Sequence, residues 1–448
     1  MDVVIIGAGN IGYTIARTLS KQHRIIVIEG DEDRYNYIVE NLDVGAVNAN
    51  GASPKVLQAV ISEDTKLLIA VTAKDETNIF ACMVAKQIKP DLITVARVRD
   101  MDYIDGGIGN ISTYVDHIIT PELLLANKMM VIASMSNVID YEPISAFGVC
   151  MAKFIIREKH RNISTIPLKT LPMPSESKVI AIHRAGKVIM PNQEDFLLVG
   201  DEVTVLGTPN GLGEFDEMIG KSDMPKDFII VGGGMLGEML AGMLENEKKT
   251  VKLIEGNEQR CHALAKTLDH TVIINENGAD PSVLRSENVN MAHVLFAVSS
   301  SEESNLLTCL ISKHYGVPKV MAVYSRRDFE DVFDRDEIDV SIGYYHVVAN
   351  EILNLTAPEF KVMLSLEDFS EEFFSLQVDD QKRLIDLEIQ DIDLPDRSII
   401  ALVVRGNLLI FPRPDLVIKK GDVVLIYASN QDIKILEKKF NAHIPFSS

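Results

Sequence analysis

Two glycine-rich stretches of this 448-residue chain have the residue types and spacing of a phosphate-binding loop. Their glycines are Gly7, Gly9 and Gly12 in the first stretch and Gly232, Gly234 and Gly237 in the second. In such a loop the first glycine allows a tight turn, the second lets the backbone approach a pyrophosphate, and the third lets a helix pack against a strand. The first amides of that helix point at the phosphates. Here they fall at Asn10, Ile11, Met235 and Leu236.

An acidic residue follows each glycine loop at the distance that ribose recognition requires. Glu29 lies 22 residues after Gly7, and Glu255 lies 23 residues after Gly232. A carboxylate at the end of the second strand accepts hydrogen bonds from ribose hydroxyls. It also repels a 2′-phosphate, so NAD is favoured over NADP. The alternative is a pair of helix-packing glycine sets, each followed by a solvated acid.

Further polar residues come where later strands should end. In the first copy they are Asn50, Gly51, Thr72, Asp75, Asn78 and Arg97, and in the second Asn277, Gly278, Ser299 and Glu302. The carboxyl ends of parallel strands gather at one edge of a sheet, beside a nucleotide crevice. Such side chains either contact the nucleotide or cap the helices that follow.

The two copies differ at one position of electrostatic importance. Arg97 ends a strand, where a guanidinium can neutralise phosphate, although an ordinary surface arginine is the alternative. The shift of 227 residues that relates Asn50 to Asn277 places Tyr324 at the position of Arg97. We therefore expect nucleotide binding to survive in the second copy with weaker discrimination between phosphate groups.

Strands and helices alternate around these residues. A strand at 3–6, a helix at 10–20 and a strand at 25–28 fit the apolar periodicity of the first residues. The later segments are 45–47, 54–60, 67–71, 76–87, 93–98, 115–119 and 121–136. This alternation predicts a doubly wound parallel sheet. The helix at 121–136 is more apolar than one amphipathic face requires, so it is either a core helix or a subunit contact.

The pattern then changes to short strands, and the whole arrangement repeats. A strand pair about Ala185 and Gly186, a turn-rich stretch at 207–211 and a short helix at 214–219 form a small α+β lobe. The strands 180–189 and 400–410 line either a ligand cleft or a dimer interface. The chain is therefore an α/β protein, a tandem duplication of a Rossmann-like lobe followed by a small α+β lobe. The expected lobes are 1–137, 138–222, 223–358 and 359–448.

Composition narrows the classes of partner. The net charge of −21 and pI near 4.9 argue against sequence-independent binding to nucleic acid or to an anionic bilayer. The most apolar stretches are far shorter than the roughly 20 residues that span a membrane, so we expect no direct membrane insertion. Widely spaced cysteines predict reduced thiols and no zinc site. These are Cys82, Cys150, Cys261 and Cys309.

The sequence contains no recognisable catalytic arrangement. It has no Ser-His-Asp spacing and no P-loop motif of the GxxxxGK[ST] kind. Asp116 and His117 form a tempting acid and base pair, but neighbours on a strand point to opposite faces. We therefore expect a structural role for them and no enzyme.

These motifs together resemble the TrkA family, cytosolic regulators of Trk potassium uptake. The resemblance rests on residues 7–12, Glu29, Asn50, 71–78 and 96–98, and on their duplication. It implies two RCK units that bind NAD(H) and ATP or ADP. It further implies a homo-oligomeric ring, a tetramer of two-unit chains, on the cytoplasmic face of the cell membrane beneath a TrkH-like potassium-translocating subunit. The bound nucleotide would bias the pore.

Two other functions remain open from the residues alone. One is an NAD-dependent oxidoreductase with duplicated Rossmann halves, and the other is a nucleotide sensor of a different transporter. For the regulatory function, our hypothesis is that the γ-phosphate of ATP recruits Arg97, or an arginine of a neighbouring subunit. This contact would change the angle between lobes.

Overall fold

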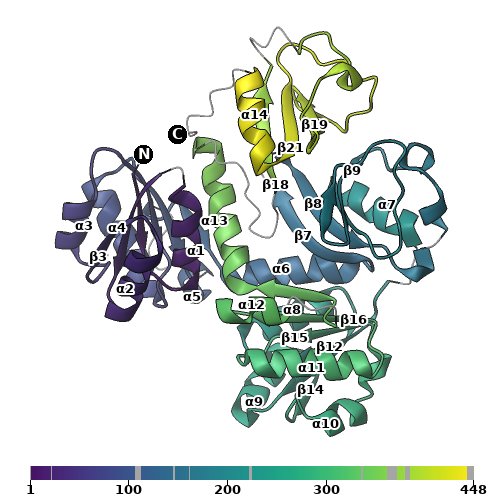
Figure 1. Ribbon diagram of the computed structural model, residues 1–448. Helices are drawn as coiled ribbons and strands as arrows, with labels where there is room; N and C mark the ends of the chain where they lie inside the picture. The colour runs from purple at the N-terminus through teal and green to yellow at the C-terminus, as the bar shows by residue number, and fades with distance from the viewer. Residues whose placement is uncertain are drawn as a thin grey trace. The chain divides into compact units, whose positions relative to one another are not determined.

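The computed structural model contains two compact units, each assembled from two separate stretches of chain. One unit comprises Met1–Met129 with Pro225–Leu355, and the other Met130–Met224 with Thr356–Ser448. The first unit holds two Rossmann-like lobes and the second holds two small lobes (Figure 1). The structure describes residues 2–21, 23–105, 113–144, 147–160, 162–220, 224–333, 337–360, 371–378 and 384–440.

The first Rossmann-like lobe is a six-stranded parallel sheet in the order β3-β2-β1-β4-β5-β6. Helices lie on both of its faces (Figure 1), as in a doubly wound fold. Its elements are β1 (Asp2–Ile6), α1 (Asn10–Leu19), β2 (Arg24–Glu29), α2 (Glu32–Asn41), β3 (Gly45–Asn48), α3 (Pro54–Val60), β4 (Thr65–Ala70), α4 (Asp75–Ile88), β5 (Ile93–Arg97), α5 (Asp102–Asp105) and β6 (His117–Ile119), followed by α6 (Pro121–Ser134).

The second Rossmann-like lobe repeats this topology. Its parallel sheet has the order β14-β13-β12-β15-β16-β17, so the predicted duplication is confirmed. Its elements are β12 (Asp227–Val231), α8 (Met235–Asn246), β13 (Thr250–Glu255), α9 (Glu258–Thr267), β14 (Val272–Asn275), α10 (Pro281–Ser286), β15 (Val294–Ala297), α11 (Glu302–His314), β16 (Lys319–Tyr324), α12 (Glu330–Phe333), β17 (Val340–Gly343) and α13 (Tyr344–Phe360).

The central strands form because their sequences suit burial on both faces. In β1 every residue from Val3 to Ile6 is at most 1% exposed, and a continuous apolar run is typical of a parallel strand covered by helices on both sides. One core of the first lobe packs Leu57 of α3 and Cys82 of α4 against Ile6 and Leu68 of the sheet. The carboxyl edge of this sheet is therefore held by a rigid interior.

The two small lobes are antiparallel sheets, each packed with one helix. The first has the strand order β10-β9-β11-β8-β7 and the second β18-β21-β19-β20. The first comprises β7 (Val138–Ile144), β8 (Val149–Ile155), β9 (Ser177–Arg184), β10 (Lys187–Ile189), β11 (Glu202–Gly207) and α7 (Pro209–Gly220). The second comprises β18 (Glu371–Gln377), β19 (Ser398–Arg405), β20 (Leu408–Ile410), β21 (Val423–Ser429) and α14 (Asn430–Phe440).

The small lobes share one hydrophobic core within the second unit. Ile180 and Leu206 of the first small lobe belong to the same buried cluster as Leu402, Leu425 and Tyr427 of the second. The strands predicted to line a ligand cleft or a dimer interface therefore pack against their own duplicates. The interface lies inside a single chain.

One helix was not predicted and the start of another was misplaced. No element was predicted at the position of α2, because only Ile38 of this helix is fully buried and the apolar periodicity is therefore weak. The stretch 207–211 was predicted as a turn, yet α7 begins at Pro209. Proline suits the first turn of a helix, and the Thr208 hydroxyl accepts the Gly211 amide at 3.0 Å, as a capping residue does.

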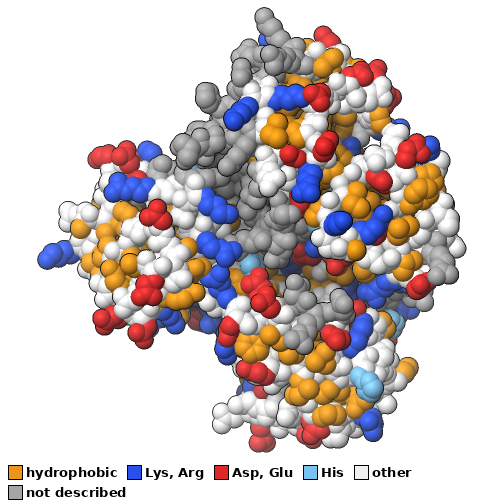
Figure 2. Space-filling model, viewed as in Figure 1, with side chains coloured by type: hydrophobic (Ala, Val, Ile, Leu, Met, Phe, Trp, Pro, Cys, Tyr) orange, Lys and Arg blue, Asp and Glu red, His pale blue; other side chains and the backbone are white. Residues whose placement is uncertain are grey.

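Helix α6 is the apolar helix of residues 121–136. Leu125, Ala126 and Met129 are fully buried within the chain, which supports the core-helix interpretation for those residues; the subunit contact stays a prediction. Among the described residues, no helix combines the length and apolar character needed to cross a membrane. On the visible face of the molecule, acidic and basic side chains are interspersed over all four lobes (Figure 2).

A buried ion pair closes each small lobe. Asp422 is fully buried and accepts hydrogen bonds from Arg405 Nε and Nη2, both at 2.8 Å, and from the Lys419 amide at 2.8 Å. Arg184 and Asp201 form the same pair in the first small lobe, at 2.7 Å. Burial alone would raise the pKa of Asp422, but the bonds from Arg405 and Lys419 outweigh it and lower that pKa.

We predict that Asp422→Asn lowers the free energy of unfolding by about 2–3 kcal/mol at neutral pH, because it leaves a partly buried guanidinium without its charge partner. The difference from wild type should shrink as the pH falls through the lowered pKa of Asp422, since the wild-type carboxylate is then protonated too. Urea unfolding at several pH values measures this. Asp415→Asn, at an exposed site, is the control, and equal stability of the two variants would contradict the prediction.

Candidate functional site

The first glycine of each loop occupies backbone space that only glycine can use. Gly7 has φ +101° and Gly232 has φ +112°, both in the left-handed region. A Cβ added at Gly7 would lie 3.1 Å from the Thr72 nitrogen, and one at Gly232 would lie 2.6 Å from the Ser299 nitrogen. The tight turn predicted from the sequence is present in both copies.

The second and third glycines differ in what surrounds them. Gly9 and Gly234 are the N-caps of α1 and α8, and a Cβ at either would meet nothing within 4 Å. A Cβ at Gly12 would lie 1.8 Å from the Gly7 carbonyl oxygen, and one at Gly237 would lie 2.0 Å from the Gly232 oxygen. The N-terminal turns of both helices are thus packed tightly on the sheet side and open at the cap, where amides can meet an anion.

The residues that follow the N-caps of α1 and α8 offer a ligand mainly their backbone amides. Ile11 and Leu236 are buried, and Met235 is half-buried. Asn10 is exposed, and its Nδ2 donates to the Ser325 carbonyl at 2.7 Å. The first loop is therefore tied to the second Rossmann-like lobe.

The two predicted ribose acids also hold the glycine loops in place. Glu29 accepts hydrogen bonds from the amides of Ala8 and Asp31. Glu255 accepts from Gly233 at 2.6 Å and from Asn257 at 2.8 Å. Both acids line cavities, and a carboxylate has lone pairs beyond these two bonds. The loop-holding role was not foreseen, because it depends on side-chain direction.

Buried asparagines fix the strand ends beside each loop. Asn78 is fully buried, accepts from the Thr72 amide at 2.9 Å, and donates to the carbonyls of Thr72 at 3.1 Å and Arg97 at 2.8 Å. Asn305 makes the same bonds to Ser299. Thr72 and Ser299 line the cavities, whereas the asparagines position them from within the fold.

This network corrects the predicted counterpart of Arg97. Asn305 donates to the Val323 carbonyl at 2.9 Å where Asn78 donates to that of Arg97. Val323, rather than Tyr324, therefore holds the place of Arg97. The shift of 227 residues was wrong there because helix α11, with 13 residues, is one residue shorter than α4, with 14. The second copy still lacks the arginine.

Asp75 and Glu302 lie beside the cavities without lining them. Asp75 accepts from the amides of Arg99 at 2.8 Å and Asp100 at 2.9 Å, and Glu302 accepts from the Ser325 amide at 3.2 Å. Asp75 begins α4 and Glu302 begins α11. Each acid holds the backbone just after the strand that follows its helix. Their direct contacts are with backbone.

The Asn-Gly pairs close the turns after β3 and β14. The Asn50 and Asn277 side chains accept the Ala52 and Ala279 amides, each at 3.0 Å. A Cβ at Gly51 would lie 2.1 Å from Ile6 Cγ2, and one at Gly278 would lie 2.3 Å from Val231 Cγ1. Packing therefore requires both glycines. Only the second pair lines a cavity among those described.

The first cavity, of about 370 Å³, is built from both Rossmann-like lobes. Arg97 donates from Nη1 to the Thr72 carbonyl at 3.1 Å and from Nη2 to the Tyr344 hydroxyl at 3.0 Å. Its Nε is buried without a hydrogen-bond partner in the described part of the chain. The lining residues are Gly7, Gly9, Asn10, Ile11, Glu29, Arg34, Val71, Thr72, Ala73, Arg97 and Arg99 from the first lobe and Ser325, Tyr344 and Tyr345 from the second.

A neighbouring cavity of about 680 Å³ shares Gly9, Asn10 and Arg34 with the first. It adds Arg326 and Arg327 of the second lobe. Its lining also includes Asp33, Asp328 and Glu330, and Asp328 pairs with Arg326. Basic side chains from two lobes therefore lie beside the first glycine loop, where they can meet phosphate, together with acids.

The second glycine loop lines a cavity of about 660 Å³ that belongs to one lobe alone. Its walls include Glu255, Asn277, Gly278 and Ser299. Arg260 is the one Lys or Arg among the described residues that line it. The two loops are alike in shape and differ in charge.

Comparison with protein families matches these two kinds of lobe. Residues 3–121 and 228–343 match the TrkA-N domain, and residues 160–220 and 373–441 match the TrkA-C domain. The Trk system potassium uptake protein TrkA homolog 2 of Methanosarcina mazei is 33% identical over 98% of this chain and 100% of that protein. The chain belongs to the TrkA family. The resemblance drawn from the sequence is confirmed.

Solved structures support the fold of this TrkA-family chain. A GsuK channel bound to NAD superposes with a TM-score of 0.60 at 15% identity, over 99% of this chain and 79% of that one. GsuK bound to ADP gives 0.50 at 13% identity, over 80% and 69%. At these identities the likeness concerns the fold.

A hydrogen-bonded cluster joins the two large lobes of the TrkA-family chain. Arg99 Nε donates to Glu122 Oε1 at 2.9 Å, and the Tyr344 hydroxyl donates to the same oxygen at 3.4 Å. Burial raises the pKa of Tyr344, so its hydroxyl keeps its proton at neutral pH. Arg97 and Glu122 are therefore connected through one tyrosine of α13. No local sequence signal predicts a pairing across more than 200 residues.

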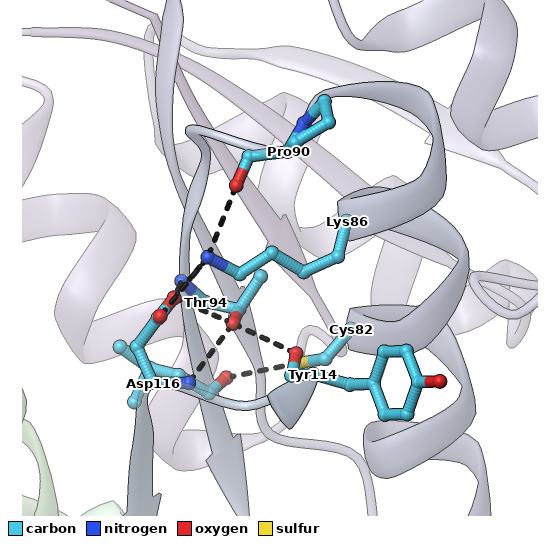
Figure 3. Close-up of polar contacts among 7 residues, drawn as sticks. Cys82, Lys86, Pro90, Thr94, Tyr114 and Asp116 are labelled. Carbon is cyan, nitrogen blue, oxygen red and sulfur yellow. Dashed lines mark hydrogen bonds and ion pairs between the residues drawn. The ribbon is translucent and has the colours of Figure 1, made fainter. Parts of the chain in front are cut away.

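Asp116 has the structural role that was expected. Lys86, Thr94 and Asp116 point toward one another (Figure 3): Asp116 accepts from Lys86 Nζ at 2.9 Å and from the Thr94 amide at 2.7 Å. Lys313 and Asp339 repeat this pair in the second lobe. Among the described residues, no group of three or more His, Cys, Asp or Glu is placed to hold a metal ion.

We predict that Gly12→Ala lowers the free energy of unfolding by about 3 kcal/mol, because its Cβ would overlap a backbone carbonyl that cannot move aside. Gly9→Ala is the matched control, since its Cβ meets open space. Thermal unfolding of the two variants tests the difference. Equal melting temperatures would show that the third glycine is not a packing requirement.

Proposed function

We propose that this TrkA-family chain is a nucleotide-sensing regulatory subunit that gates a TrkH-like potassium-translocating membrane subunit. The observation that carries the proposal is the first cavity, whose walls come from both Rossmann-like lobes. A nucleotide held there contacts two lobes at once. It therefore stabilises one arrangement of the lobes over others.

The physical requirement for gating is a difference in affinity. A ligand that binds two conformations equally well shifts nothing, however tightly it binds. Arg97 supplies such a difference because its guanidinium joins Thr72 of the first lobe to Tyr344 of the second. A phosphate that attracts Arg97 competes with that bond.

The residues of the first loop fit a nucleotide. The open cap at Gly9 leaves room for a pyrophosphate, and the unpartnered Arg97 Nε is a buried donor for an anion. Proposed ligand contacts are the amides of Gly9, Asn10 and Ile11, with Glu29 for the ribose, and Thr72 and Arg97 for the phosphates. Gly7, Gly12, Asn50, Gly51, Asp75 and Asn78 shape the site.

The second loop fits a nucleotide by the same backbone geometry. We propose that Gly234, Met235 and Leu236 present amides, and that Glu255 and Ser299 take the places of Glu29 and Thr72. Gly232, Gly237, Asn277, Gly278 and Glu302 shape this site. Because Val323 replaces Arg97, this site should distinguish ATP from ADP less strongly.

The ligands proposed are NAD(H) and ATP or ADP. Support comes from the solved GsuK structures, one described as bound to NAD and one as bound to ADP. The assembly proposed is a homo-oligomeric ring of four two-unit chains, cytoplasmic and held at the inner membrane face through its partner. The lobe boundaries proposed are 1–137, 138–222, 223–358 and 359–448.

Gly9→Asp and Gly234→Asp should each abolish nucleotide binding at one site without unfolding the lobe. Either aspartate sits at an N-cap, where it satisfies the helix amides that a phosphate would use. Because Gly9 and Gly234 line the two cavities, the added side chain also takes up space that any ligand of the cavity needs, while its Cβ meets no protein atom. Isothermal titration with ATP, ADP, NAD and NADH should show one lost site per variant. Unchanged titrations in both variants would refute the nucleotide-sensing function. Steady consumption of NADH with an added substrate would favour the oxidoreductase instead.

Arg97→Ala should reduce ATP affinity by about 10- to 100-fold, the effect of one charge-assisted hydrogen bond, and ADP affinity less. The cause is the loss of a cation that meets the terminal phosphate. Titrations in the Gly234→Asp background isolate the first site. Tyr344→Phe is the control: it removes the hydrogen bond between Arg97 and the second lobe while keeping the charge of Arg97 and the aromatic ring beside it, so ATP affinity should not fall. The hypothesis is wrong if Arg97→Ala leaves the ATP and ADP affinities and their ratio unchanged.

A further inference from the structure

The second cavity has lost most of the positive charge that lines the first. Arg34, Arg97 and Arg99 line the first cavity. Val323 is the counterpart of Arg97, because its carbonyl accepts from Asn305 as that of Arg97 accepts from Asn78. Ser325 is the counterpart of Arg99, because its amide donates to Glu302 as that of Arg99 donates to Asp75. One arginine therefore remains where the first lobe has three.

The remaining arginine, Arg260, is the counterpart of Arg34. The Arg34 amide donates to the Asp31 side chain at 3.0 Å, and the Arg260 amide donates to the Asn257 side chain at 2.9 Å. Asp31 and Asn257 are the N-caps of α2 and α9, the helices that follow the second strand of each lobe. Arg34 is exposed and makes no ion pair with any described residue. The two side chains begin at the same place in the fold, but only that of Arg260 is held in an ion pair.

Arg260 is held against the second glycine loop by fixed acceptors. Its Nε donates to the Gly233 carbonyl at 2.5 Å, and its Nη2 donates to Glu238 Oε2 at 2.6 Å. The other carboxylate oxygen of Glu238 accepts from the Thr267 hydroxyl at 2.7 Å. Both members of the pair are therefore anchored to α8 and α9.

Glu238 places a negative charge in the first turn of α8. Burial alone would raise the pKa of Glu238, but the hydrogen bonds from Thr267 and Arg260 outweigh it and lower that pKa, so the carboxylate is ionised at neutral pH. A carboxylate in this turn interacts favourably with the positive end of the helix. It therefore opposes a second anion there.

The first lobe has a neutral side chain at this position. Tyr13 follows Gly12 as Glu238 follows Gly237, and its ring packs under the guanidinium of Arg327 at 4.2 Å. The duplicated loops thus differ by an acid against an aromatic ring, directly after the third glycine. The difference favours phosphate in the first site and opposes it in the second.

We propose that Glu238 is a specificity determinant of the second site: by holding Arg260 in an ion pair, it makes that site select the nucleoside of its ligand and ignore the number of phosphates. The inference rests on the proposed function, because it assumes that the second lobe binds a nucleotide. Nucleoside recognition is unaffected, since Glu255 and Asn277 line the cavity separately from the pair. The first site then discriminates between ligands by their phosphates, and the second by their nucleoside.

The test compares adenosine with ATP, which share a nucleoside and differ in phosphates. Titrations use the full chain carrying Gly9→Asp, so that only the second site binds. In this background adenosine and ATP should bind within about tenfold of each other. Glu238→Gln keeps the shape of the side chain and removes its charge, and should raise ATP affinity about tenfold without changing adenosine affinity. Adding Arg260→Gln should remove that gain.

Each outcome decides a separate question. An ATP affinity that exceeds adenosine affinity by more than a hundredfold before Glu238 is changed would overturn the inference. So would an unchanged ratio in Glu238→Gln, or a gain that persists without Arg260. If neither ligand binds in the Gly9→Asp background, and Gly234→Asp changes nothing in the wild type, the second site of the proposed function is refuted, and the inference with it. Thermal unfolding confirms that each variant is folded.

Discussion

The close approach of a helix to the turn that precedes it is the constraint on which both Rossmann-like lobes depend. At Gly12 and Gly237 there is no room for a Cβ beside the carbonyl oxygen of the loop's first glycine. This contact sets the axis of α1 and α8, and the axis sets where their free amides point. The acids at the ends of β2 and β13 then bond to the same loops. Backbone packing and one buttressing carboxylate thus fix the anion-facing end of each helix together.

Duplication keeps this packing and leaves the charges around it free to change. Both copies retain the buried asparagine that joins two strand ends, the first glycine with its left-handed backbone, and the same strand order. What differs are side chains at strand ends and near the starts of helices, such as Arg97 against Val323 and Tyr13 against Glu238. Changes at these positions cost the fold little, because the scaffold beneath them is backbone. Two sites of one shape can thus come to prefer different ligands.

Local patterns made most of the fold predictable from the sequence. Glycine spacing, strand runs and the repeat identified both large lobes, because each signal can be read along the chain without knowing which residues meet in space. Helix α2 was missed because its single fully buried residue gives little periodicity. The contact of Arg97 with Tyr344 joins residues 247 apart and has no local signature. The register of Val323 could not be read because the one-residue difference in length between α4 and α11 leaves no trace in the flanking glycines and acids.

The core shared by the two small lobes has a consequence for stoichiometry. Because the two small lobes of one chain bury their apolar sheet faces against each other, the chain is a covalent pseudo-dimer. Its two halves are therefore always present in equal number. In a ring of identical single-unit subunits, a single substitution alters every site at once. Here each chain carries two different halves, so one half can lose a charge while the other keeps it. Pseudo-symmetry therefore permits a division of labour between neighbouring sites that strict symmetry forbids.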